Sequence, residues 1–195
     1  MGSLAPDAVH FRENYLSDMK KRSHLCIGSE AWGSVTNNSE WQENVLSFFN
    51  TSRNEHNFDF ICGYCSHILA DIQNNINIWI PFKIANNDFL ESGAGEEYKQ
   101  ELLNLDYKLY LTNPYRKVIW DLLVNAAGYN IKDIIFADEI DRMKDSLINS
   151  QFKNRDNVDT SNNKFVSLQR IQKFIASAAD SIQNLLFSNV QPQIF

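Results

Sequence analysis

Cysteine, basic residues and long apolar runs are all scarce in this chain of 195 residues. Its 3 cysteines are too few for a disulfide-stapled scaffold, and their odd number favours a reducing cytoplasm. No apolar run reaches the roughly 18 residues that a membrane-spanning helix needs, and the first residues lack the pattern of an export signal. We therefore expect a cytoplasmic protein without a membrane partner, or a periplasmic or secreted one if a leader has been removed.

Basic residues are fewer than acidic residues in this chain. The chain has 18 lysines and arginines against 24 aspartates and glutamates, which gives a formal net charge of -6. Binding to a phosphate backbone requires clustered basic side chains, and the one tight basic run, Lys20–Arg22, has the position of a solvated helix tip. Nucleic acid is therefore not an expected partner.

Common catalytic motifs are missing as well. The sequence contains no glycine-rich phosphate loop, no Gly-x-Ser-x-Gly and no His-Glu-x-x-His. Its acidic clusters at 96–97 and 138–145 lack the spacing of inward-facing carboxylate ligands and are typical of exposed helix faces that form ion pairs. We predict neither a metal nor a cofactor on this basis.

What the chain does have is enough apolar sequence, 44% of its residues, for one substantial core. We predict a mainly α, single-domain helical bundle over residues 1–195, with at most a small two- or three-stranded sheet and a mobile polar loop at 152–163. Apolar spacing and capping residues predict helices at 6–22, 39–49, 58–74, 96–106, 113–128, 131–151 and 164–188. Short strands are expected at 25–27 and at 76–80, where isoleucines alternate with other residues.

Cys62 and Cys65 form the most distinctive motif, a CxxC. The segment 58–65, Phe-Asp-Phe-Ile-Cys-Gly-Tyr-Cys, resembles the strand-then-CxxC segment of the thioredoxin-fold DsbA-like oxidoreductases. Segments 76–81 and 164–166 are similar to later strands of that family. The resemblance implies an α/β thioredoxin-like fold with a helical insertion, in which Cys62 is the attacking thiol and Cys65 resolves the mixed disulfide.

The alternative is that both cysteines lie inside a helix that begins near Phe58, with Cys65 in its buried stripe. We favour this interpretation because the chain has no proline between Pro114 and Pro192, where that family places a cis-proline opposite its cysteines. The hypothesis that Cys62 and Cys65 bind zinc has less support still, since His67 and Cys26 would have to complete an irregular ligand set.

A second resemblance involves residues 53–56, Arg-Asn-Glu-His. This run resembles the Arg-Asn and following His of the HEPN helical ribonucleases, which implies RNA cleavage with His56 as a proton shuttle. The spacing is tighter here, and the run lies in a polar break, so a solvated loop is the simpler interpretation.

We therefore expect a non-catalytic, acidic protein-binding module, such as an inhibitor or immunity-type protein, whose partner has a basic surface. A thiol-disulfide oxidoreductase and a HEPN-like ribonuclease remain the alternatives. The predicted binding residues are Trp32, which lies in a glycine-containing connector, and the heptad-like positions Leu168, Ile175 and Ile182 of the last helix.

Overall fold

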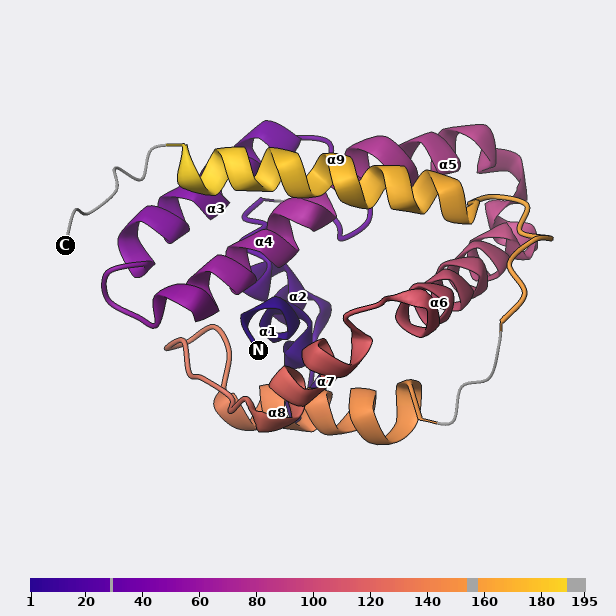
Figure 1. Ribbon diagram of the computed structural model, residues 1–195. Coiled ribbons are helices and arrows are strands. Elements are labelled where there is room, and N and C mark those ends of the chain that lie inside the picture. The colour runs from indigo at the N-terminus through magenta and orange to yellow at the C-terminus, as the bar shows by residue number, and fades with distance from the viewer. Residues whose placement is uncertain (29, 154–157, 189–195) are drawn as a thin grey trace.

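The computed structural model describes residues 1–28, 30–153 and 158–188 (Figure 1). Within these ranges the chain is helical and has no strand, apart from one isolated bridge between Ile131 and Ile135. The prediction of a mainly α protein is thus confirmed. The α-helices are α1 Ala5–Ala8, α2 Ser17–Ser23, α3 Asn38–Ser52, α4 Phe58–Asn74, α5 Ile80–Ala85, α6 Gly95–Thr112, α7 Arg116–Asn125, α8 Ala137–Ser146 and α9 Leu168–Phe187.

Helix α4 is the central element. Its first turn is capped by Asn57, whose side chain accepts a hydrogen bond from the Phe60 amide at 2.9 Å. Apolar residues then recur every three or four positions and form a continuous buried stripe: Ile61, Cys65, Ile68 and Ile72. Helices α3 and α9 both pack on α4, and α9 runs along it for much of its length (Figure 1).

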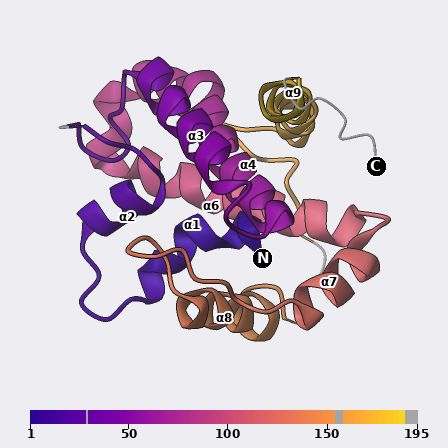
Figure 2. The same ribbon diagram turned by 90° about the vertical axis from the view of Figure 1, so that its left-hand side faces the viewer.

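The N-terminal segment packs tightly on α4, and α1 lies between α4 and α8 (Figure 2). Two glycines allow this approach. A Cβ atom added at Gly63 would lie 2.9 Å from the Ser3 amide nitrogen, and one added at Gly2 would lie 2.0 Å from the Phe60 carbonyl oxygen. Residues 1–8 are therefore fixed against the middle of α4, where α4 contributes its own polar side chains.

Both predicted strands are wrong. Helix α4 continues through a π-helical turn, Asn75–Trp79, directly into α5, and residues 25–27 form an irregular connector. The turn is favoured because buried Asn75 donates hydrogen bonds to the Val35 carbonyl and the Asn38 side chain. Pro81 is tolerated because it occupies the first turn of α5, where a missing amide hydrogen costs little.

The predicted helix at 6–22 is two helices. Helix α1 ends at Ala8, and the chain reverses through a 3-10 turn at Val9–Phe11 and a left-handed residue, Asn14, before α2 begins. The predicted helix at 131–151 likewise starts only at Ala137, because a left-handed residue at Asp133 closes a turn ahead of it. The first of these reversals brings α1 and α2 side by side.

Two hydrophobic clusters make up the core. The larger surrounds α4, and the smaller lies among the α5, α6 and α9 segments, where Phe82 stacks on Tyr98. Helix α9 contributes Ile171 to the smaller cluster and Leu186 to the larger one. The chain entering α9 is tied to α6 by Glu101, whose buried carboxylate accepts hydrogen bonds from the amides of residues 164–166.

The loop predicted at 152–163 lies only partly within the described residues. Residues 154–157 fall outside them, and 158–163 form irregular structure with a turn in which the Asp159 side chain accepts a hydrogen bond from the Ser161 amide. No helix in the part of the chain that the structure describes has the length and hydrophobicity needed to cross a bilayer.

Candidate functional site

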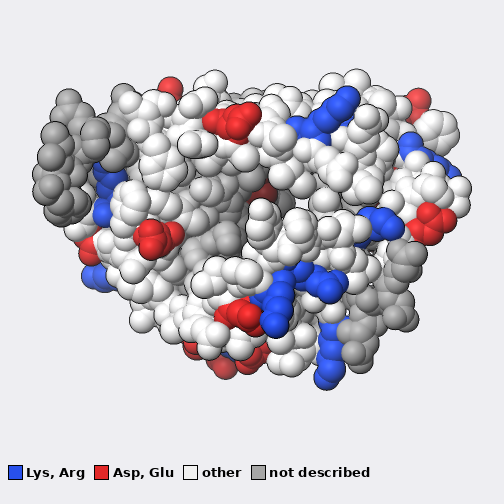
Figure 3. All heavy atoms as spheres, viewed as in Figure 1, with Lys and Arg blue, Asp and Glu red and all other residues white. Residues whose placement is uncertain are grey.

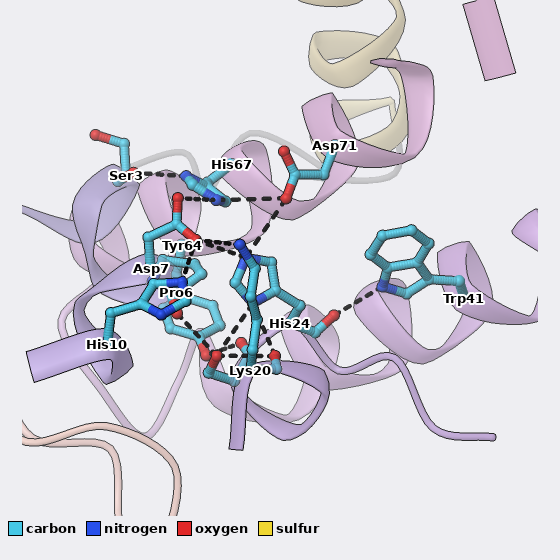
Figure 4. A network of polar contacts seen from close by, with 11 residues as sticks. Ser3, Pro6, Asp7, His10, Lys20, His24, Trp41, Tyr64, His67 and Asp71 are labelled. Atoms are coloured by element: carbon cyan, nitrogen blue, oxygen red, sulfur yellow. Dashed lines mark hydrogen bonds and ion pairs between the residues drawn. The ribbon is translucent and has the colours of Figure 1, made fainter. Parts of the chain in front are cut away.

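Two histidines and two aspartates meet beside the middle of α4 (Figure 4). His24 Nε2 lies 3.3 Å from Asp7 Oδ1 and 3.4 Å from Asp71 Oδ2. His67 Nε2 lies 3.7 Å from Asp7 Oδ2 and 3.5 Å from Asp71 Oδ2. We call these four residues the Asp-His cluster. Four side chains from three separate segments therefore converge on one point.

The local structure explains why they converge. His67 and Asp71 are four residues apart on α4 and so share one face of the helix. Asp7 is carried by α1, which the two glycines allow to approach α4. His24 directly follows α2. Each residue is thus placed by regular structure and its packing.

The backbone around His24 is held by buried hydrogen bonds. The Trp41 indole donates to the His24 carbonyl at 2.7 Å, and the Tyr64 hydroxyl donates to the carbonyl of the preceding residue, Ser23. The Ser23 hydroxyl itself contacts the Pro6 carbonyl at 2.8 Å, which ties α2 to α1. His24 therefore presents its ring from a rigid support.

Both imidazoles are oriented by backbone carbonyls. His24 Nδ1 lies 2.9 Å from the Lys20 carbonyl oxygen, and His67 Nδ1 lies 2.8 Å from the Ser3 carbonyl oxygen. A carbonyl can only accept a hydrogen bond, so Nδ1 carries the hydrogen in each ring. Each Nε2 is then directed toward the carboxylates. Histidines that bind metals commonly donate their other ring N–H to a backbone carbonyl in this way.

The centre of the cluster holds unsatisfied polar atoms. His24 Nε2 and His67 Nε2 are buried and have no hydrogen-bond partner among the described residues, and Asp7 Oδ1 is buried with the Lys20 ammonium 3.0 Å away. The possible ligand atoms of these three residues all lie within 4.8 Å of one another. Neutral imidazole lone pairs facing carboxylate oxygens repel each other, so a proton or a metal ion must lie between them.

Electrostatics within the cluster favour a cation. Burial raises the pKa of Asp7, but contacts with His24, Lys20 and His67 outweigh it, and the pKa lies well below the usual range. Burial lowers the pKa of His67, but Asp71 and Asp7 outweigh it and the net shift is upward. The two shifts are reciprocal, because positive groups beside Asp7 lower its pKa and the carboxylates beside His67 raise the pKa of the imidazole.

A pocket of about 640 Å³ opens next to the Asp-His cluster. Asp7, Asp71 and Lys20 line the pocket. Its walls also contain Tyr98, Lys99 and three tryptophans, Trp32, Trp41 and Trp79. Its volume lies within the range of small-molecule binding sites. The cluster is therefore accessible to a ligand of moderate size.

The pocket also contains an unused polar group. Tyr98 is only 3% exposed, and its hydroxyl lacks a hydrogen-bond partner within the described ranges. Burial raises the pKa of Tyr98 to about 12, so the hydroxyl stays protonated and can donate. A buried donor in a pocket wall is a ready partner for a bound polar atom.

Cys62 and Cys65 lie inside α4 and not at its first turn. Cys65 is fully buried and Cys62 is partly buried; both thiols are free. Burial raises the pKa of both thiols, that of Cys65 to about 12. A redox-active CxxC needs a lowered thiol pKa, so the geometry does not favour the oxidoreductase interpretation.

The predicted binding residues occupy different positions. Trp32 is half-buried, lies against the core and lines the pocket, with its ring edge-to-face with His24. Leu168 packs on the smaller hydrophobic cluster and Ile182 on the larger one. Ile175 is 47% exposed. Thus Trp32 lines the pocket, Leu168 and Ile182 pack on the core, and Ile175 is exposed on the surface of α9.

Arg53 and His56 of the HEPN-like segment lie in the turn between α3 and α4. His56 contacts the Tyr129 hydroxyl at 3.1 Å, and the guanidinium of Arg53 lies over the Phe49 ring. The two side chains thus contact different groups. Neither contact brings an arginine beside a histidine in the manner of that ribonuclease motif.

Sequence reasoning selected His67 only as a partner for cysteines and did not find Asp7, His24 or Asp71. The available signal was the spacing of His67 and Asp71, which places two metal-ligand types on one helical face. Asp7 and His24 carry no signal of their own, because only the reversal between α1 and α2 brings them to α4.

No known protein-family model, curated protein or solved structure matches this chain.

Acidic and basic side chains are interspersed on the face shown in Figure 3, without an extended patch of one sign. The expected protein-binding role, with a basic partner, remains a prediction that the structure does not test.

Proposed function

We propose that the Asp-His cluster binds one divalent transition-metal ion, best matched by Zn²⁺, and uses it to hydrolyse a substrate held in the adjoining pocket. The observation that carries this proposal is the convergence of two Nε2 atoms and two carboxylates at 3.3 to 3.7 Å. Imidazole nitrogen and carboxylate oxygen are typical zinc ligands.

The spacing supports a small tetrahedral cation. Ligand atoms about 2.0–2.1 Å from zinc are separated by about 3.3–3.4 Å when the geometry is tetrahedral. The separations of His24 Nε2 from Asp7 and Asp71, 3.3 and 3.4 Å, match this value. Calcium is a poorer match because it takes oxygen ligands in larger number.

Hydrolysis is favoured over a purely structural role because three ligands, from Asp7, His24 and His67, would leave a fourth position open beside the pocket. Structural zinc sites are closed by protein on all sides, whereas Asp7 and Asp71 both line the pocket. Water entering from the pocket can reach the metal, and zinc lowers the pKa of bound water to about 7. A carboxylate oxygen outside the coordination shell can then accept its proton.

Zinc titration calorimetry on His67→Gln and His56→Gln proteins tests the proposal. His67→Gln removes a ligand, and His56→Gln is a matched control, because its imidazole contacts Tyr129 instead of the cluster. We expect one zinc ion per wild-type and control chain, and at least about tenfold weaker binding to His67→Gln. Equal affinity of all three proteins would refute the metal site.

Activity is tested on a panel of nitrophenyl esters with zinc-loaded protein. We expect turnover that disappears with a chelator and with Asp71→Asn, and that persists in Asp59→Asn, an exposed aspartate of the same helix. Zinc binding without turnover of any ester in the panel would leave a metal-binding protein and contradict the hydrolytic part of the proposal.

A further inference from the structure

Lys20 lies where the Asp-His cluster meets the pocket. Its Nζ atom is 3.0 Å from Asp7 Oδ1 and 4.7 Å from the centre of the Trp32 ring. The side chain is 19% exposed and lines the pocket. Figure 4 shows it beside Asp7 and His24. The neighbouring Lys21 points elsewhere, since its Nζ donates to the Gly28 carbonyl at 2.6 Å.

The charge on this part of the pocket depends on the metal. With Nδ1 protonated and Nε2 acting as ligand, His24 and His67 are neutral. The charges of the two aspartates and of a divalent ion then cancel. The Lys20 ammonium is left as the unbalanced charge, because Lys99, the other lysine of the pocket, pairs with Glu96 at 2.6 Å. Without the metal ion, the same ammonium faces two carboxylates, and one proton held between the imidazoles and carboxylates leaves these groups with no net positive charge. The proposed metal therefore changes the preference of the pocket from cationic or neutral ligands to anionic ones.

The pocket wall also carries the aromatic rings of Trp41 and Trp79. The Trp41 and Trp79 indole N–H groups donate to the carbonyls of His24 and Gly33, at 2.7 and 2.8 Å. Because these donors are already satisfied, both residues present only ring carbons to a ligand. Planar apolar groups are bound well by such surfaces.

We infer that the pocket takes an anionic substrate with a planar apolar group, and that Lys20 is the residue that selects for the negative charge. The inference rests on the proposed metal site, since the metal neutralises the aspartates. Trp41 and Trp79 provide the surface for the apolar group, and Lys20 binds the charged group close to the reacting centre.

Two matched probes test the inference by calorimetry: 2-naphthalenesulfonate, which is anionic and a weak metal ligand, and the neutral 2-naphthalenemethanol. With zinc-loaded protein we expect the sulfonate to bind at least about tenfold more tightly than the alcohol. With a chelator present, this preference should be lost. Lys20→Met should abolish the preference in zinc-loaded protein and leave binding of the alcohol within about twofold of wild type.

Lys21→Met is the control, because it removes an adjacent positive charge that does not line the pocket. It should retain the full preference for the sulfonate. Zinc uptake without a preference for the sulfonate, or an equal loss in the Lys20 and Lys21 variants, would overturn the inference alone. Failure of the same samples to take up zinc would instead overturn the proposed function.

Discussion

The contact between Arg12 and Glu139 should contribute strongly to stability, and Glu139→Gln tests how strongly. The guanidinium donates to both carboxylate oxygens of Glu139, at 2.5 and 3.0 Å, and the Glu139 side chain is only 2% exposed. The same carboxylate accepts a hydrogen bond from the Phe136 amide at 3.0 Å and so caps α8. The pair joins the segment after α1 to α8.

The substitution keeps one oxygen for the Phe136 amide but removes the charge opposite Arg12. Breaking a buried ion pair in this way costs about 3–5 kcal/mol. Arg12 retains 18% exposure, so solvent can partly compensate and the lower end, about 3 kcal/mol, is expected. For a chain of this size, that corresponds to a fall in melting temperature of about 6–12 °C.

Urea unfolding followed by tryptophan fluorescence provides the assay. The control is Asp138→Asn, one residue earlier in the same helix, which removes an exposed ion pair with Arg142. Exposed pairs of this kind contribute about 0–1 kcal/mol. A loss below about 1 kcal/mol for Glu139→Gln, or one equal to that of the control, would refute the argument that burial makes this pair important.

Three further predictions concern the site and its support. Gly63→Ala should lower both stability and zinc affinity, because the added Cβ atom would push Ser3 and the attached α1 away from α4. The control is Gly95→Ala, whose Cβ atom meets no atom within 4 Å and which should change neither property. Thermal melts and zinc titration measure the two properties. Zinc affinity should fall from about pH 8 to about pH 5.5, since the raised pKa of His67 makes a proton an effective competitor, and pH-independent binding would contradict this ligand assignment. Folded protein should react with a thiol reagent more slowly than unfolded protein, because burial raises the pKa of Cys62 and Cys65; fast reaction of Cys62 below neutral pH would instead favour the redox interpretation.

Local sequence patterns were sufficient to predict a helix where its apolar periodicity agrees with its packing in the structure. The apolar spacing from Ile61 to Ile72 predicts α4 correctly, and the same holds for α9. The alternating isoleucines at 76–80 predict a strand, which is wrong. Hydrogen bonds from buried Asn75 to distant partners favour a π-helical turn there. A periodicity argument does not include such long-range contacts.

The Asp-His cluster could not be predicted in full for the same reason. His67 and Asp71 are neighbours along one helix, and their pairing is encoded locally. Asp7 and His24 reach them only because the chain reverses after α1 and because Gly2 and Gly63 permit close packing. The sequence shows each of these residues but not their convergence, which depends on the tertiary structure.

The most direct test of the metal site is an anomalous difference map from crystals of zinc-loaded protein, recorded at the zinc absorption edge. We expect a single strong peak about 2.0–2.1 Å from His24 Nε2, His67 Nε2 and a carboxylate oxygen of Asp7, with the fourth position open to water beside Asp71. A peak elsewhere in the molecule, or the four side chains in direct contact with no peak between them, would contradict a metal-dependent function.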